Sequence, residues 1–234
     1  MAPNKLVLLD IDGTLLIGAG SGRMATELAM REVFGTSGKL ADYTFGGKTD
    51  FYTLVELLSP EGFTEAQIAE TLPHYSTVLV GHMSNIIGNY EIHALPGALE
   101  LVDALAAHPD VLLGLITGNV LPMAELKLRT VGIDPARFAI AAYGTEARIR
   151  RELVPLVLVR AEQRSGSHFA PRDVIFVGDT VDDIDCAHSI GGHIFAVATG
   201  NTPRAVLEQH PPVTVLDNLS DIQTLLSLMF SEGS

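Results

Sequence analysis

Six short apolar runs constrain the fold of this 234-residue chain more than any other feature. Each run is nearly continuous in apolar residues, a pattern typical of parallel strands that are buried on both faces. Helical patterns lie between several of the runs, at residues 98–105, 121–131 and 152–164. This alternation predicts an α/β fold with a doubly wound parallel sheet. The predicted strands are residues 6–9, 111–116, 138–142, 174–177, 194–197 and 213–216.

Residues 17–93 interrupt this alternation with helical patterns and no convincing strand. One apolar face recurs at i, i+3, i+4 and i+7, and it is formed by Phe51, Leu54, Val55 and Leu58. Thr64 with Gln67 resembles a capping box that opens the next helix, and Pro73 is expected to kink or interrupt that helix. We therefore predict a helical insert between the first two core strands.

The predicted boundaries give a core domain of residues 1–16 and 94–234 and a cap domain of residues 17–93. The glycine-rich entry at residues 18–22 suits a hinge, although a simple turn would explain the same glycines. The insert returns to the core near residues 94–97. An insert placed after the first strand of such a sheet would lie over the crevice where ligands usually bind.

Composition narrows the classes of partner. Apolar residues make up 47% of the chain and charged residues 18%, so we expect a sizeable core rather than disorder. The formal net charge of −13 disfavours a broad contact with a phosphate backbone, and we expect no nucleic-acid partner. A small anionic ligand in a locally positive pocket stays compatible with this charge.

Other features predict a reducing, cytoplasmic setting. No uninterrupted apolar stretch reaches membrane-spanning length, and residues 1–5 lack the pattern of a secretory signal, so we expect no membrane partner. The single cysteine, Cys186, has no partner for an internal disulfide and is expected to pack as a small apolar side chain. Both a monomer and a homodimer fit the sequence.

The motif Asp10-Ile11-Asp12-Gly13-Thr14 follows the first apolar run directly. The chain turns just past a strand end, and Gly13 gives this turn conformational freedom. One carboxylate there can bind a cation or attack phosphorus, while the second donates a proton to a leaving oxygen and later accepts one from water. An acidic turn without chemistry is the plainer alternative.

A second acidic turn, Gly178-Asp179-Thr180-Val181-Asp182-Asp183, follows the run at residues 174–177. It would face Asp10 across the point where the strand order reverses, and such oxygen donors suit Mg²⁺. We predict Asp179 as a direct ligand and Asp183 as a ligand through water or as an orienting group. Helix capping alone would also explain acidic residues here.

A third polar turn, Thr117-Gly118-Asn119, ends the run at residues 111–116. Its hydroxyl, its backbone N–H groups and the start of the following helix can form a cradle for an oxyanion. We therefore expect these residues to bind a substrate anion. A helix cap is the alternative for so short a motif.

Together these motifs resemble those of the haloacid dehalogenase-like hydrolase superfamily over nearly the whole chain. The turn at residues 10–14 resembles its first motif, Thr117 its second, and Gly178-Asp179 with Asp183 its fourth. The resemblance implies a Rossmann-like core, Asp10 as the phosphorylated nucleophile and Asp12 as the general acid/base. It also implies Mg²⁺ held by Asp10, by the backbone carbonyl of Asp12 and by Asp179. The helical insert resembles a C1-type cap, as in phosphoglycolate phosphatase-like members.

The third motif of that family is a Lys or Arg that neutralises phosphoryl oxygens and holds the nucleophile. Family spacing favours Arg150, which has Arg148 and Arg151 as neighbours. Lys127, on the helix after Thr117, is the alternative. A solvated helix charge would explain any one of these residues.

The loop Phe45-Gly46-Gly47-Lys48-Thr49-Asp50 is the motif in the insert that offers a substrate contact. Its glycines allow close approach, and Lys48 could meet an anionic leaving group. A capped helix start at Thr49 or Asp50 explains the same residues.

These observations predict a Mg²⁺-dependent phosphatase that acts on a small phosphorylated metabolite through an aspartyl-phosphate. A phosphomutase shares the same core and cap, and no residue separates it from a hydrolase. A haloacid dehalogenase lacks the second aspartate in this family, so Asp12 argues against it. A non-catalytic module that binds a phosphorylated metabolite is disfavoured because every expected acidic residue is present.

Overall fold

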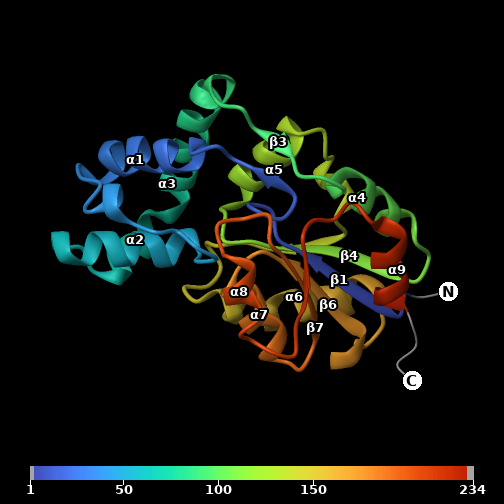
Figure 1. Ribbon diagram of the computed structural model, residues 1–234. Helices are drawn as coiled ribbons and strands as arrows, with labels where there is room; N and C mark the ends of the chain where they lie inside the picture. Colours follow the sequence, from blue (N-terminus) through green and yellow to red (C-terminus); the bar gives the residue numbers. More distant parts are fainter. Residues whose placement is uncertain (1–2, 231–234) are drawn as a thin grey trace.

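The computed structural model describes residues 3–230 and has a central six-stranded sheet in which all strands are parallel (Figure 1). The strand order is β5-β4-β1-β6-β7-β8, so β1 lies between β4 and β6 and the order reverses there. The predicted α/β doubly wound sheet is confirmed. The strands are β1 Lys5–Leu9, β4 Val111–Ile116, β5 Ile140–Ala142, β6 Val174–Gly178, β7 His193–Val197 and β8 Thr214–Leu216.

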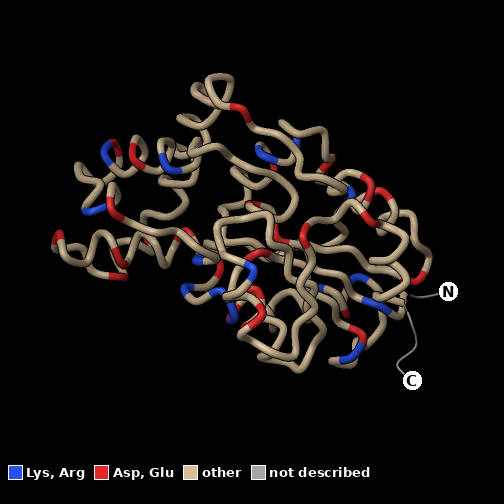
Figure 2. The backbone as a smooth tube through the Cα atoms, in the orientation of Figure 1, with Lys and Arg blue, Asp and Glu red and all other residues tan. Residues whose placement is uncertain are grey.

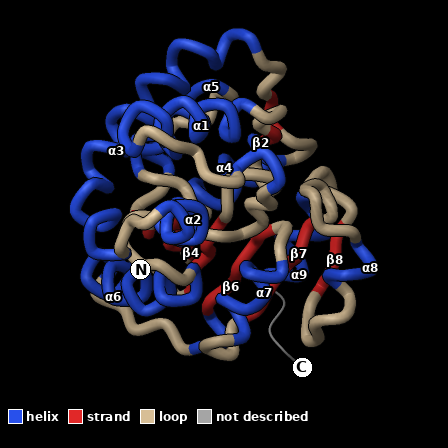
Figure 3. The backbone as a smooth tube through the Cα atoms, turned by 90° about the vertical axis from the view of Figure 1, so that its left-hand side faces the viewer, coloured by secondary structure: helices blue, strands red, loops and turns tan. Residues whose placement is uncertain are grey.

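Helices cover both faces of the sheet because successive strand side chains point to opposite sides (Figure 3). Val7 and Leu9 of β1 pack in a cluster with α4 Ala98–Ala107, α5 Leu121–Thr130 and α9 Ile222–Phe230. Leu6 and Leu8 pack in a second cluster with α6 Leu153–Ser165, α7 Val181–His188 and α8 Arg204–Leu207. Burial on both faces explains the uninterrupted apolar runs. Short 3₁₀ turns lie at Leu40–Asp42, Ser59–Glu61, Ile87–Asn89, Pro135–Arg137, Arg150–Glu152 and Pro171–Asp173.

The insert forms a separate group of helices beside one end of the sheet (Figure 1). It consists of α1 Ser21–Phe34, α2 Asp50–Leu58 and α3 Glu65–Ile86, which share a third apolar cluster. The expected face of α2 packs into that cluster. Thr64 and Gln67 form the predicted capping box of α3, but the predicted interruption at Pro73 is wrong because the helix runs unbroken past it. The apolar face that α3 buries offsets the hydrogen bond that proline removes.

A two-stranded antiparallel ribbon joins the insert to the core. Its strands are β2 Leu16–Ile17 and β3 His93–Ala94. The expectation that residues 17–93 contain no strand is therefore wrong at both ends, because two-residue strands are too short to show a pattern in sequence. The glycine run turns at Gly20, whose φ is +87°, and α1 begins at the next residue.

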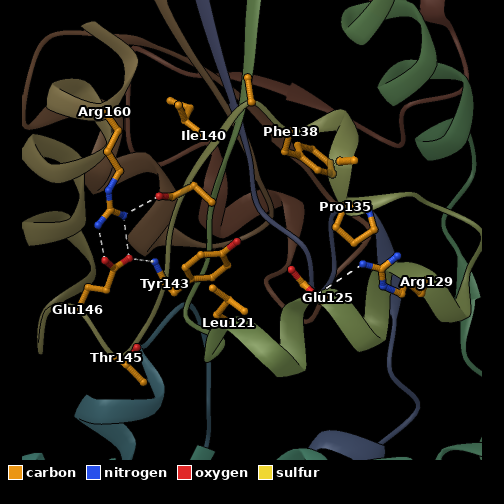
Figure 4. A pocket seen from close by; sticks show the side chains of 13 residues that line it. Leu121, Glu125, Arg129, Pro135, Phe138, Ile140, Tyr143, Thr145, Glu146 and Arg160 are labelled. Carbon is orange, nitrogen blue, oxygen red and sulfur yellow. Dashed lines mark hydrogen bonds and ion pairs between the residues drawn. The ribbon is translucent and has the colours of Figure 1, made fainter. Parts of the chain in front are cut away.

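One edge of the sheet, at β5, is partly covered by side chains (Figure 4). Arg160 Nη1 donates to the Ala141 carbonyl at 2.6 Å, and Tyr143 N donates to Glu146 Oε2 at 2.8 Å. Arg160 and Glu146 also form an ion pair with each other. A hollow of about 660 Å³ lies along this edge. Filling the edge hydrogen bonds in this way disfavours strand-to-strand association.

Acidic and basic positions are interspersed along the backbone (Figure 2). Over residues 3–230, no helix combines the length and the apolar character that crossing a membrane requires.

Candidate active site

The carboxyl ends of three neighbouring strands bring the predicted motifs together. Asp10 follows β1 and its N–H donates to Val177 of β6, and Thr117 follows β4 and its N–H donates to Ala142 of β5. Asp179 follows β6. Because β4, β1 and β6 are adjacent, residues that are far apart in sequence meet at one edge of the sheet.

Three buried carboxylates form a group that could hold a metal ion. Asp10, Asp179 and Asp183 each offer one oxygen, and these oxygens lie within 4.8 Å of one another. Their residues are only 3%, 4% and 3% exposed. Burial raises the pKa of Asp10 to about 7, with repulsion from Asp183 and Asp12 adding to it and Arg150 opposing it. Burial and the charges of Asp10 and Asp183 likewise raise the pKa of Asp179 well above its ordinary value. A divalent cation with oxygen preference fits this donor set, since it would offset the repulsion.

Two glycines make room for the Asp179 carboxylate. A Cβ at Gly13 or at Gly200 would overlap Asp179 Oδ2, and Gly13 has a φ of +83°. Thr199 Oγ1 donates to the Gly13 carbonyl at 2.6 Å and so links the loop after β7 to the first motif. The loop at residues 199–200 is not among the predicted site residues, although a polar turn with glycine after the predicted strand at 194–197 was its signal in the sequence.

Asp183 lies in the acidic group and also opens α7. Its Oδ2 accepts from Thr180 N at 3.0 Å and from Thr180 Oγ1 at 2.6 Å, which forms a capping box. Its Oδ1 is 2.7 Å from Arg150 Nη2. Both carboxylate oxygens therefore have protein partners, which suits an orienting role.

Arg150 is buried at the centre of the acidic group. Its Nη2 donates to Asp10 Oδ1 at 2.6 Å and to the Ile116 carbonyl at 2.9 Å. Its Nη1 donates to the Gly47 carbonyl of the insert at 3.0 Å, and its Nε is buried without a hydrogen-bond partner. This single side chain thus contacts the first motif, the fourth motif and the insert.

Lys127 contacts a different carboxylate. Its Nζ lies 2.8 and 2.7 Å from the two oxygens of Asp12 and 2.7 Å from Asn119 Oδ1. Asn119 Nδ2 donates to Asp12 Oδ2 at 2.7 Å and to Thr117 Oγ1 at 2.8 Å. Burial raises the pKa of Asp12, but the charge and hydrogen bonds of Lys127 and the Asn119 amide outweigh it, so the pKa is lowered. The two cations that the sequence offered for one position therefore reach two different acids.

Lys48 contacts side chains of the insert rather than the group of buried acids. Its Nζ is 2.9 Å from Glu56 Oε2 and 4.6 Å from the centre of the Tyr43 ring. Its backbone carbonyl packs against Gly118, where a Cβ would overlap it. In the structure as it stands, the ammonium group is held by side chains of the insert.

A cavity of about 330 Å³ lies between the core and the insert. Core motifs form its floor, and the entry glycines, Arg23, Phe45 and Leu79 line it from the insert. A volume of this size fits a small ligand.

Comparisons with known proteins agree with this fold. A model of haloacid dehalogenase-like hydrolases matches residues 4–191. No curated protein matches the sequence. Similar solved structures include a hydrolase from Pseudomonas syringae with 17% identity and a TM-score of 0.71, covering 97% of this chain and 99% of that one. CbbY from Rhodobacter sphaeroides in complex with phosphate has 18% identity and a TM-score of 0.65, with 95% and 96% of the two chains covered. A predicted phosphoglycolate phosphatase from Haemophilus somnus has 22% identity and a TM-score of 0.64, with 97% and 99% covered.

The structural likeness at these identities shows a shared fold, and the family model spans most of the sequence. The chain belongs to the haloacid dehalogenase-like hydrolase family.

Proposed function

We propose that this protein is a Mg²⁺-dependent phosphomonoester hydrolase that acts on a small phosphorylated metabolite. The observation that carries the proposal is the convergence of Asp10, Asp179 and Asp183 beside Arg150. Asp10, Asp179, Arg150 and Thr117 also line one cavity. A hydrolase of this family with such a donor set has the groups that phosphoryl transfer requires.

The metal would be held by the side chains of Asp10 and Asp179 and by the backbone carbonyl of Asp12. Asp183 would bind through water or orient the other ligands, in keeping with its bonds to Arg150 and Thr180. When bound, Mg²⁺ would offset the negative charge of the carboxylates and of the phosphoryl oxygens.

In the first step, Asp10 attacks phosphorus, the bond from phosphorus to the ester oxygen breaks, and Asp12 protonates the leaving oxygen. Lys127 favours the ionised form of Asp12 in the ligand-free protein. A phosphoryl dianion beside Asp12 would raise its pKa again through like-charge repulsion, which supports proton donation.

In the second step, Asp12 removes a proton from water, and the water oxygen attacks the phosphorus of the aspartyl-phosphate. The bond between phosphorus and Asp10 breaks, which releases inorganic phosphate and restores the carboxylate. Lys127 and Asn119 hold Asp12 in place for both proton transfers.

The remaining site residues bind the charge and the substrate. Arg150 takes the role of the third-motif cation because its guanidinium meets Asp10, whereas Lys127 meets Asp12. Thr117, Gly118 and Asn119 would contact phosphoryl oxygens at the start of α5. Lys48 would contact an anionic leaving group only after leaving Glu56.

The insert acts as a cap in this proposal, with residues 17–93 as the cap domain and residues 1–16 and 94–234 as the core. The β2–β3 ribbon would serve as the hinge, and the cavity between the two parts would enclose the leaving group. Exclusion of bulk water would strengthen the electrostatic interactions in the site.

The test is Mg²⁺-dependent phosphate release across a panel of phosphorylated metabolites, with Asp10→Asn as the variant. We expect this variant to stay folded with a cooperative melting transition and to lose at least roughly 1,000-fold in kcat, because an amide cannot form the acyl phosphate. A folded Asp10→Asn protein with wild-type turnover would reject the assignment.

The same panel separates the alternatives. A phosphomutase would return an isomeric phosphate ester and release little inorganic phosphate. A dehalogenase would release halide from haloacids without Mg²⁺. Tight binding of a phosphate ester without turnover of any compound would indicate a binding module.

A further inference from the structure

The core helix α5 and the insert helix α2 cap each other at their first turns. The first N–H groups of a helix have no partner within that helix. Asp50 N, at the start of α2, donates to the Gly118 carbonyl at 2.8 Å, and Phe51 N donates to the Gly144 carbonyl at 3.3 Å. In return, Val120 N, at the start of α5, donates to Asp50 Oδ2 at 2.8 Å. Each helix start therefore depends on the other part of the molecule.

Asp50 is a good capping partner for Val120 because Val120 has no polar side chain. The N-cap position of α5 has no side-chain hydrogen bond of its own. Burial raises the pKa of Asp50 to about 6, while the Val120 N–H and Lys127 oppose the rise and Asp12 adds to it. Asp50 is half-buried and lines the cavity between the core and the insert, so its carboxyl group is partly shielded from solvent.

Asp50 holds both residues that flank Asn119. Its N–H binds the Gly118 carbonyl on one side, and its carboxylate binds Val120 N on the other. Asn119 in turn donates to Asp12 Oδ2 at 2.7 Å and accepts from Lys127 Nζ at 2.7 Å. A continuous set of contacts therefore leads from the insert to Asp12.

We propose that Asp50 is a positioning residue, which holds Asn119 against Asp12 when the insert docks on the core. This inference rests on the proposed role of Asp12 as the proton donor. Docking of α2 fixes the backbone from Gly118 to Val120, and Asp12 reaches its working position only then. The insert therefore closes over a substrate and brings Asp12 into position in the same movement.

The test compares phenyl phosphate with p-nitrophenyl phosphate, two esters of similar size. The nitrophenolate leaves without a proton far more readily than phenolate, so general-acid catalysis matters mainly for phenyl phosphate. The value of kcat/KM reports the first chemical step. We expect Asp50→Ala to lose at least about tenfold more in kcat/KM on phenyl phosphate than on p-nitrophenyl phosphate.

Two further variants act as controls. Asp50→Asn keeps an oxygen that can accept from Val120 N, so both esters should retain wild-type rates within about threefold. Glu70→Ala removes an exposed carboxylate elsewhere in the insert and should change neither rate. Equal losses of Asp50→Ala on the two esters, or no loss on either, would overturn the proposal.

A second readout does not depend on turnover. With Mg²⁺ and inorganic phosphate present, hydrogen exchange of the Val120 amide should be slow in the wild type and in Asp50→Asn, and at least about tenfold faster in Asp50→Ala. If the wild type releases no phosphate from either ester or from any compound of the metabolite panel, the proposed function fails. The exchange rate then decides the inference, and an unchanged rate in Asp50→Ala overturns it.

Discussion

At the scale of single residues, the acidic side chains of the site are shared between two buried cations. Arg150 contacts Asp10 and Asp183, and Lys127 contacts Asp12. Two of the acids in the group, Asp10 and Asp179, keep raised pKa values despite Arg150. Burial and mutual repulsion of the carboxylates are therefore only partly offset by the protein, and a metal ion would supply the rest.

This imbalance predicts how stability depends on pH. A carboxyl group whose pKa is raised in the folded state binds more protons when folded, so its contribution to stability is lost as pH rises through the folded pKa. In EDTA, we expect the free energy of unfolding to fall from about pH 5 to about pH 8, by at most about 1.4 kcal/mol per pH unit for each such group. Mg²⁺ should reduce this fall, because it favours the ionised carboxylates.

The measurement is urea unfolding at several pH values, with EDTA and with Mg²⁺. Asp10→Asn serves as the control, since it lacks one of the raised groups and should show a shallower dependence in EDTA. A free energy of unfolding that rises with pH over this range in EDTA would contradict the prediction.

At the scale of elements, local chemistry explains where helices begin and end. Thr49, Thr64 and Thr180 each accept a hydrogen bond from a backbone N–H of the first turn of α2, α3 and α7. The helix α3 contains two weak helix formers, Pro73 and Gly81, and continues through both. Its buried face, rather than its intrinsic propensity, therefore stabilises it.

Replacing Gly81 or Gly62 of the insert with alanine should change the free energy of unfolding in opposite directions. Gly81 is exposed in the interior of α3 with open space around its Cβ position, so Gly81→Ala should raise the free energy of unfolding by about 0.5–1 kcal/mol. Gly62 also has open space but a φ of +95°, so Gly62→Ala should lower it by about 1 kcal/mol. Urea unfolding of the two variants measures both shifts, and shifts of the same sign would refute the argument.

At the scale of the whole molecule, the insert and the core share a tightly packed junction. The Lys48 carbonyl lies against Gly118, Thr49 Oγ1 donates to the Arg148 carbonyl at 2.6 Å, and Arg148 pairs with Glu65 at 2.7 Å. These contacts span residues that are 70 or more positions apart in sequence. The junction therefore exists only when the insert lies against the core.

Gly118 offers a test of this junction. Its backbone φ is not left-handed, but a Cβ would overlap the Lys48 carbonyl oxygen, so Gly118→Ala should hold the insert away from the core. We expect kcat/KM to fall roughly 100-fold, because reacting groups are misplaced. The free energy of unfolding should fall by about 1–3 kcal/mol, because the junction cannot close around the added methyl group. Gly88→Ala is the matched control, since its Cβ would meet no atom within 4 Å. Wild-type kcat/KM in Gly118→Ala would show that the close approach is not needed.

Local patterns in the sequence predict the six strands of the parallel sheet and the acidic turns at their ends, but not the two short strands of the β2–β3 ribbon. Continuous apolar runs and strand-to-turn transitions are local patterns, and local patterns can be recognised from the sequence alone. The positions of Asp10, Thr117 and Asp179 at one edge of the sheet follow from these patterns together with the rule that parallel strands present their carboxyl ends on one side.

Which cation pairs with which acid depends on the tertiary fold. Family spacing favoured Arg150 over Lys127, but the sequence could not assign either cation to its acid, because side-chain reach across the sheet depends on packing between distant segments. The partnership of Lys48 with Glu56, the use of Gly200 beside Asp179, and the bond from Asp50 to Val120 have the same origin. Each is a contact between side chains or loops brought together by the fold, and no local pattern encodes such a contact.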